Sequence, residues 1–134
     1  MKCVIDDVNK VMKIFLRVMV DKDELRKFIS NCGAVNCKDD LGRTMLHYAV
    51  LNENLDAVRI LLEANARVNE EDNDLRTPMH YLAVIGNDSI AKYILQHTNV
   101  LYKEDLYGQT PACLAQWRGN LAIVDMLKIG NMYV

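Results

Sequence analysis

The strongest constraint on this chain is a sequence segment that recurs three times at a fixed interval. The copies begin at Asp39, Asp72 and Asp105, which lie 33 residues apart. In each copy the Asp is followed three residues later by Gly or Leu, and two residues after that by Thr. A period of this length is typical of repeat architectures, in which copies of one supersecondary unit stack on their neighbours. The repeat therefore decides the fold class.

Each copy contains two stretches with helical spacing of apolar residues, separated by a short turn. Thr residues stand where a helix N-cap belongs, and Pro78 sits in a first helical turn, where its missing N–H costs nothing. We expect antiparallel helix pairs in every copy. The predicted helices cover residues 44–52 and 55–64, then 77–85 and 88–97, and finally a helix from Pro111 and one over 121–129.

The N-terminal part of the chain also predicts two helices but lacks the Thr entry of the later copies. Residues 6–20 carry one wide apolar stripe, with Asp6 or Asp7 as the N-cap, and a second helix runs from Asp21 to Cys32-Gly33. We expect a divergent N-terminal cap. The organisation predicted is a single domain over 1–134: the cap over 1–38, two repeats over 39–71 and 72–104, and a C-terminal repeat over 105–134.

The composition argues against several classes of function. The 51% hydrophobic and 25% charged residues are ordinary for a globular protein, and a net charge of -2 argues against nucleic-acid binding. No apolar run is long enough for a signal peptide or a membrane span. The four cysteines form no tight framework, so we expect reduced thiols in an intracellular protein, cytoplasmic or nuclear.

The repeated segments resemble the ankyrin repeat family. The match rests on Asp39-x-x-Gly42-x-Thr44 with His47 and Ala49, on Thr77-Pro78-Met79-His80, and on Thr110-Pro111. The resemblance implies an all-α ankyrin-repeat solenoid of stacked helix-turn-helix units with finger-like hairpin loops. It also implies protein binding through one concave face, with no catalysis and no cofactor.

Two departures from the family pattern mark places where this chain differs. Leu75 stands where the finger turn has Gly42 and Gly108 in the other copies, and a residue with positive φ there would cost about 1 kcal/mol. Thr98 replaces the Gly that ends the second helix in the family. We therefore expect either that Asn73 or Asp74 takes up the strain or that the middle finger is shaped differently, and we expect an altered path after that helix.

Several residues suggest chemistry but have simpler roles. His47 and His80 could suggest a metal pair, yet one repeat spacing separates them by roughly 10 Å, too far for a shared ion. The family uses this His to hydrogen-bond the adjoining turn. Asp39, Asp72 and Asp105 are expected to accept hydrogen bonds within turns. A hydrolytic or metal site around His47 and Asp39 stays a remote alternative, and the chain is predicted not to be an enzyme.

The candidate partner-binding residues are those at the finger tips and at the ends of the first helices. Leu51, Ile85 and Trp117 are large apolar residues among them, and with Tyr and Arg they have the make-up of an interface hot spot. The alternative is that some of them pack under the fingers or against the next repeat. The full set is Asp40, Leu41, Arg43, Tyr48, Leu51, Asn52, Asn73, Asp74, Leu75, Arg76, Tyr81, Val84, Ile85, Leu106, Tyr107, Gln109, Trp117 and Arg118.

The predicted function is that of a non-catalytic protein-interaction module acting as an inhibitor, decoy or adaptor. A transcription-factor inhibitor and a host-directed effector are both compatible with a chain that is little more than repeats. Its partner is a protein, not a nucleic acid or a membrane. The alternative is self-association into a weak homodimer through the incompletely capped C-terminal repeat, where Met126, Met132 and Tyr133 are expected to be exposed.

Overall fold

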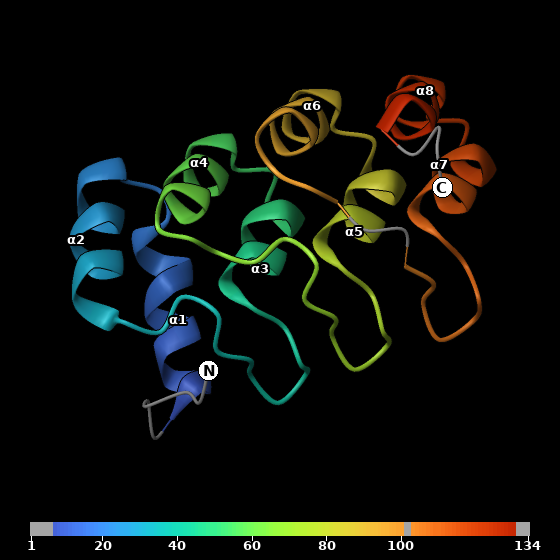
Figure 1. Cartoon of the computed structure of the whole chain (residues 1–134). Coiled ribbons are helices and arrows are strands. Elements are labelled where there is room, and N and C mark those ends of the chain that lie inside the picture. Colours follow the sequence, from blue (N-terminus) through green and yellow to red (C-terminus); the bar gives the residue numbers. More distant parts are fainter. Residues whose placement is uncertain (1–6, 101–102, 131–134) are drawn as a thin grey trace. The chain divides into compact units, whose positions relative to one another are not determined.

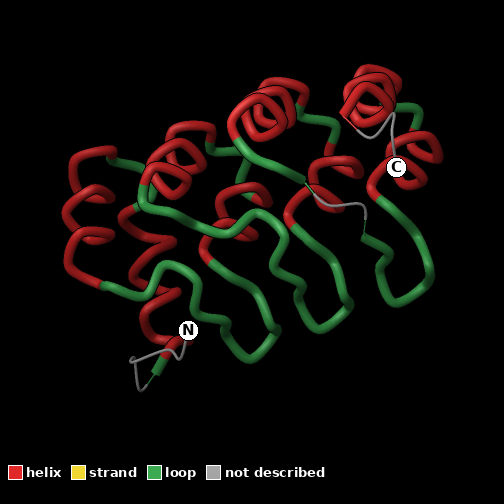
Figure 2. The backbone as a smooth tube through the Cα atoms, viewed as in Figure 1, coloured by secondary structure: helices red, strands yellow, loops and turns green. Residues whose placement is uncertain are grey.

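The structure, a computed structural model, describes residues 7–100 and 103–130. The chain divides into two compact units, residues 1–67 and 68–134, and each is considered by itself. Within the described ranges every regular element is an α-helix, and there is no strand. Figures 1 and 2 show these helices as antiparallel pairs joined by long loops.

The first unit consists of two helix pairs. Helix α1 packs against α2 and α3, while α4 packs against α2 and α3. The first helices of the pairs thus form one layer and the second helices form another (Figure 1). The bounds are α1 Val8–Val18, α2 Lys22–Cys32, α3 Met45–Leu51 and α4 Leu55–Glu63.

The second unit repeats this arrangement. Helix α5 packs against α6 and α7, and α8 packs against α6 and α7. The bounds are α5 Pro78–Ile85, α6 Asp88–His97, α7 Pro111–Arg118 and α8 Leu121–Gly130. These helices begin and end within one or two residues of the predicted positions, which is the usual uncertainty of a helix end.

Side-chain caps explain where the helices begin. The Asp7 carboxylate accepts a hydrogen bond from the Lys10 amide at 3.1 Å, and Asp21 does the same for Glu24 at 3.2 Å. The Thr110 hydroxyl accepts from the Cys113 amide at 3.2 Å. Such caps satisfy amides that have no partner inside the helix, and each contributes about 1 kcal/mol.

The core of each unit lies between its two helix layers. Phe15, Leu25, Leu46 and Leu61, one from each helix of the first unit, are fully buried. In the second unit Leu82, Ile90, Ile94, Ile123 and Leu127 are fully buried. Burying one such side chain contributes about 1.5–3 kcal/mol, so these contacts hold each pair of helices in place.

The helix ends confirm the expected differences between copies. Gly33 and Asn65 both adopt left-handed backbone, with φ of 61° and 68°. Thr98 instead is extended, with φ −139° and ψ 166°, so the chain does leave this helix by a different path. Two asparagines then tie successive loops together: Asn36 donates to the Asn65 carbonyl, and Asn69 to the Asn99 carbonyl.

The expectation of four reduced thiols is wrong for Cys37, which is disulfide-bonded, whereas Cys32 and Cys113 are free. Sequence spacing could not reveal this bond, because it depends on which segments the fold brings together. None of the described helices is long and apolar enough to cross a membrane.

Candidate functional site

Three loops, which we call fingers 39–43, 72–76 and 105–109, share one hydrogen-bonded turn. In finger 72–76 the Asp72 amide donates to the Arg76 carbonyl at 2.9 Å, and the Leu75 amide donates to the Asp72 carbonyl at 2.9 Å. The Asp72 Oδ1 atom also accepts from the Asp74 and Arg76 amides, both at 2.9 Å. Asp39 and Asp105 make the same bonds in their fingers. The prediction that these aspartates stabilise turns is confirmed.

Leu75 adopts the positive φ that its position demands. Its φ is 60°, whereas Gly42 and Gly108 at the same place in their fingers have φ of 76°. Left-handed backbone costs an L-residue about 1 kcal/mol. The Leu75 side chain is 42% exposed, so burial does little to offset this cost. The middle finger therefore has the same turn as the others, with the strain at Leu75 itself, and the expectation of a differently shaped finger is wrong.

Tyr48 and Tyr81 brace the bases of the first two fingers. Each hydroxyl donates to the Oδ2 atom of the finger aspartate, Tyr48 to Asp39 and Tyr81 to Asp72. The Arg43 guanidinium lies over the Tyr48 ring at 5.7 Å from its centroid. Burial and the bond to Asp39 raise the pKa of the Tyr48 hydroxyl. Both tyrosines are half-buried, and their hydroxyls are engaged in these bonds to the finger aspartates.

Finger 105–109 is anchored differently, because Leu114 replaces the tyrosine. Its aspartate, Asp105, has a fully buried side chain whose Oδ2 atom accepts from Arg76 Nε at 3.2 Å. The Leu106 amide also donates to the Asp74 carbonyl at 2.9 Å, which joins the tips of two fingers. Burial would raise the pKa of Asp105, but hydrogen bonds from Gln109, Tyr107 and Arg76 outweigh it and lower the pKa.

His80 connects helix α5 to finger 105–109. Its Nδ1 atom accepts from the Thr77 amide at 3.0 Å, and its Nε2 atom donates to the Gln109 carbonyl at 2.9 Å. Burial lowers the pKa of His80 and keeps the ring neutral, as this bonding requires. The prediction that this histidine bonds the adjoining turn is confirmed. Among the residues that the structure describes, no group of three or more His, Cys, Asp or Glu side chains could hold a metal ion.

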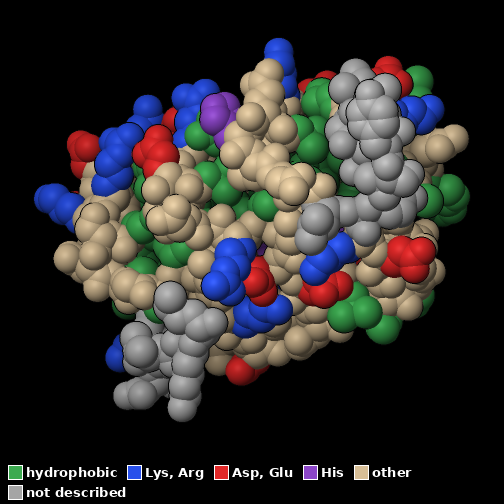
Figure 3. Space-filling model, in the orientation of Figure 1, with side chains coloured by type: hydrophobic (Ala, Val, Ile, Leu, Met, Phe, Trp, Pro, Cys, Tyr) green, Lys and Arg blue, Asp and Glu red, His purple; other side chains and the backbone are tan. Residues whose placement is uncertain are grey.

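The candidate partner-binding residues divide into two groups by exposure. Figure 3 shows acidic and basic side chains next to one another over the loops in its lower half, so no single sign of charge dominates there. The exposed candidates are Asp40, Leu41, Asn52, Asn73, Asp74, Leu75, Leu106, Tyr107, Trp117 and Arg118. The half-buried candidates are Arg43, Tyr48, Leu51, Arg76, Tyr81, Val84, Ile85 and Gln109.

The last repeat presents the most exposed apolar candidates. Trp117 is 84% exposed at the end of α7, and Tyr107 and Leu106 are 74% and 58% exposed at the finger tip. By contrast Ile85 is half-buried, as is Leu51 in the first unit. Of the three apolar helix-end residues singled out in the sequence, Trp117 alone is freely accessible.

Sequence reasoning missed a set of asparagines that fix the spacing of the helix pairs. Asn54 accepts from the Ala57 amide and donates to the Met19 carbonyl at 2.9 Å, one pair back along the chain. Asn120 likewise donates to the Ala83 carbonyl at 2.6 Å. Asn87 caps α6 through the Ile90 amide at 3.0 Å. The sequence did contain a signal for these asparagines, because Asn54, Asn87 and Asn120 follow the turn between the two helices of each repeat at the same 33-residue period.

The repeat geometry agrees with the comparison with known families. A family model described as ankyrin repeats, with three copies, matches residues 14–103. The chain belongs to the ankyrin repeat family. The predicted fold class is thereby confirmed, and ankyrin repeats are in general protein–protein interaction modules. A search of curated proteins returned no match to the chain.

The family match ends before finger 105–109, yet the structure continues the pattern beyond it. Asp105 closes the same turn, Thr110 caps α7 and Gly119 ends it with φ of 76°. Helices α7 and α8 then pack together as the other pairs do. The part of the chain with the most exposed apolar candidates therefore has the ankyrin geometry although the family model does not reach it.

Proposed function

We propose that this ankyrin-repeat chain binds a partner protein through its finger tips and the ends of its first helices. It acts without catalysis, by occupying a surface of the partner as an inhibitor, decoy or adaptor. The observation that carries the proposal is the exposure of Leu106, Tyr107 and Trp117 in the last repeat. Large aromatic residues of this kind supply most of the energy at protein interfaces.

Comparison with the other repeats shows which of these exposed residues distinguish the last repeat. Leu106 stands where the other fingers carry Asp40 and Asn73. Tyr107 corresponds to Asp74 in the middle finger and to Leu41, which is 54% exposed, in the first. Leu106 is apolar where both other fingers are polar, and its exposure together with that of Tyr107 and Trp117 indicates a surface that another molecule covers.

The backbone that carries these side chains is held firmly before any partner arrives. Asp105 fixes the finger turn through the Tyr107 and Gln109 amides, at 3.0 and 2.8 Å. Asn120, directly after the α7 turn, is bonded to the carbonyls of Ala83 and Val84. A surface with little freedom to lose binds more tightly, because association then costs less conformational entropy.

The experiment captures partners from the native host with the wild-type chain and with Tyr107→Asp/Trp117→Asp, followed by mass spectrometry. Both residues are exposed, so the variant should melt at the same temperature as the wild type. We expect the variant to lose the partner, with affinity falling by at least a hundredfold if each residue contributes about 2 kcal/mol.

The matched control is Ser89→Asp/Gln96→Asp, which adds the same charge at exposed positions of α6. It should retain the partner fully. A partner captured equally by both variants would show that binding does not use the last repeat.

Self-association through the C-terminal repeat is the second candidate. Leu121, 65% exposed at the start of α8, adds apolar surface close in sequence to Trp117. Met126 is half-buried, and Met132 and Tyr133 lie outside the described residues. Light scattering over a concentration series tests this. A constant monomeric mass at the highest concentration would end the proposal, and a dimer that Leu121→Asp dissociates would support it.

The cellular role follows from the identity of the partner. A captured transcription factor would make the chain an inhibitor in the cytoplasm or nucleus, whereas a captured protein of another organism would make it a host-directed effector. The same capture experiment distinguishes these, because the role is a property of the bound protein and not of the fold.

A further inference from the structure

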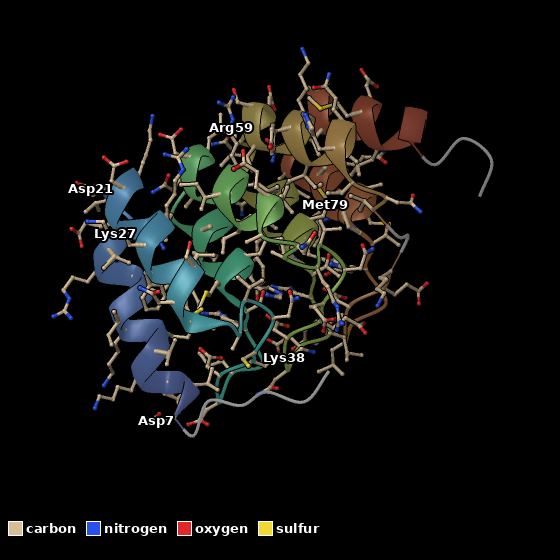
Figure 4. The ribbon with its side chains drawn as sticks, turned by 60° about the vertical axis from the view of Figure 1, so that its left-hand side comes forward. Asp7, Asp21, Lys27, Lys38, Arg59 and Met79 are labelled. Carbon is tan, nitrogen blue, oxygen red and sulfur yellow. The ribbon has the colours of Figure 1, made fainter. Side chains whose placement is uncertain are left out.

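The solvent-facing side of α1 carries only positive charge. Lys10, Lys13 and Arg17 are exposed and follow the i, i+3, i+7 spacing that places side chains on one helix face. Met12 and Phe15, on the opposite side, are buried in the core of the first unit. Figure 4, where Asp7 marks the start of the helix, shows nitrogen-tipped side chains extending from it away from the rest of the protein.

These cations have no carboxylate partners in the described part of the chain. The ion pairs found there do not involve Lys10, Lys13 or Arg17. The Asp7 carboxylate is engaged as the N-cap of the helix. The neighbouring helix α2 behaves differently, since its Lys22 pairs with Asp56 at 3.6 Å. Within this helix pair α2 therefore carries charges of both signs, whereas the charged residues of α1 are all cations.

Two exposed apolar side chains lie in or just after this helix. Leu16 is 37% exposed, and Val20, just beyond the helix, is 86% exposed. With a helical repeat of about 100° per residue, Leu16 falls between Lys13 and the buried Met12, at the edge of the row of cations. Apolar residues bordering cations have the composition of a protein interface, in which apolar contact supplies affinity and charge supplies orientation.

We propose that this basic face, made of Lys10, Lys13, Leu16, Arg17 and Val20, docks an acidic amphipathic helix of a partner protein. The three cations span about two helical turns, roughly 10 Å. A partner helix with Asp or Glu at the same spacing presents its carboxylates over the same length, and Leu or Ile beside them meets Leu16 and Val20. Charge complementarity and matched spacing thus select one kind of occupant.

A membrane surface and a nucleic acid fit the basic face less well. An interfacial helix inserts its apolar side into the bilayer, but the apolar side of α1 is buried in the core. Polybasic membrane sites also use about four to eight cations. Nucleic-acid sites are strongly basic, whereas this chain has a net charge of -2 and the face includes exposed Leu16 and Val20.

This inference goes beyond the function proposed above, because it uses α1 and not the fingers or the first-helix ends of the last repeat. The two can fail separately. Loss of the captured partner in Tyr107→Asp/Trp117→Asp concerns the fingers, while the test below reads out α1 alone.

The test is an NMR titration of the ¹⁵N-labelled full chain with a designed helical peptide of about 18 residues, long enough to form a helix. The peptide carries Glu at i, i+3 and i+7 on one face with Leu beside them, and a second peptide has the same composition in shuffled order. We expect the amide resonances of α1 to shift with the designed peptide and to move much less with the shuffled one.

The variant Lys10→Gln/Lys13→Gln/Arg17→Gln should bind the designed peptide about tenfold more weakly, because each exposed pair contributes a factor of about two. The matched control, Lys27→Gln/Lys92→Gln/Lys128→Gln, removes the same charge at other exposed helix positions and should bind as the wild type does. Raising the salt concentration should erase the difference between the two variants.

Three outcomes would overturn the proposal. The shuffled peptide could bind equally well, which would reduce the effect to net charge. Shifts in the wild-type titration could fall outside α1. Anionic lipid vesicles or duplex DNA, tested at the same ionic strength, could bind more tightly than the peptide and lose that binding in the α1 variant, which would assign the face to another class of ligand.

Discussion

Fingers 72–76 and 105–109 have the same turn but are held in place by different side chains. In both, one aspartate accepts two backbone amides, and the hydrogen-bond lengths differ by about a tenth of an ångström or less. The remaining oxygen of Asp72 takes the Tyr81 hydroxyl from its own repeat, whereas that of Asp105 takes Arg76 from the repeat before. The turn of each finger therefore depends on bonds within that finger, whereas the bond that holds its aspartate in place can come from the preceding repeat.

This difference indicates where the chain is free to vary. The last finger needs no tyrosine of its own, because Arg76 and His80 reach it from the preceding repeat. Its tip can consequently carry Leu106 and Tyr107, which serve no structural bond through their side chains in the described structure. Because residues of the preceding repeat hold this finger in place, the side chains at its tip remain available to bind a partner.

The largest effect should come from removing the buried carboxylate. Asp105→Ala breaks two bonds to amides and removes the ion pair with Arg76, so the free energy of unfolding should fall by about 3 kcal/mol. Asp72→Ala, which loses a tyrosine hydroxyl in place of a charged partner, should cost about 2 kcal/mol. Urea denaturation measures both. Equal losses would contradict the difference in anchoring.

The second prediction concerns acid. The pKa of His80 is lowered in the folded protein by burial, so between that pKa and the ordinary value the unfolded chain binds more protons. Stability should be fully present above the ordinary histidine pKa of about 6.5 and fall as the pH drops toward the folded value. Urea denaturation at a series of pH values gives the slope, and His80→Gln should make it shallower.

The pH dependence of the unfolding free energy has a matched control in the last repeat. Cys113 occupies the position of His80 in the last repeat and has no titrating ring in this range. Cys113→Ser should therefore leave the slope between pH 5 and 7 unchanged, to about 0.2 kcal/mol in that range. A slope that His80→Gln does not alter would show that other groups control acid stability.

A smaller loss is expected from the tyrosine hydroxyls. Tyr81→Phe removes the hydrogen bond to Asp72 but keeps the ring that lies beneath Arg76, so it should cost about 1 kcal/mol. Tyr48→Phe should cost the same, because it makes the same bond to Asp39. Chemical denaturation of both variants provides the measurement. A neutral result in either would mean that water replaces the hydroxyl without loss.

The smallest effect concerns the strained turn. Leu75→Gly should stabilise the chain by about 0.5 kcal/mol, because relief of the positive φ slightly exceeds the entropy that glycine adds to the unfolded state. Gly42→Leu should destabilise by more, about 1 kcal/mol, because Gly42 is buried and a leucine there would meet crowding as well as the positive φ. Thermal melting resolves both signs. If Leu75→Gly lowers stability, the Leu75 side chain makes a stabilising contact that outweighs the cost of its positive φ.

The sequence predicted the local geometry well, because local geometry is encoded in single residues. Asp7 and Thr110 start helices, Gly33 and Asn65 end them, and the finger aspartates close turns, all through bonds to atoms a few residues away. The period then supplied the pairing of the helices. Even the strain at Leu75 could be inferred, since the glycines one period away defined the backbone that it had to adopt.

The candidate site was harder to predict because exposure depends on distant neighbours. Tyr48 and Tyr81 looked like interface residues, but their hydroxyls turn inward to aspartates nine residues earlier. Ile85 and Trp117 were grouped together, yet the structure leaves Trp117 exposed and half-buries Ile85. Sequence position gave the face of each helix, whereas packing decided which side chains on it stayed accessible.

The contact between Gly86 and Asn120 limits how such a chain can change by duplication. A Cβ atom at Gly86 would lie 2.9 Å from Asn120 Oδ1, so the space that the glycine leaves is already filled from the following repeat. Asn120 can occupy this place only if residue 86 is a glycine, although the two residues belong to different repeats. A recombination that joins repeats from two ancestors must bring both or neither, and the inheritable module is therefore the junction between repeats as much as the repeat itself.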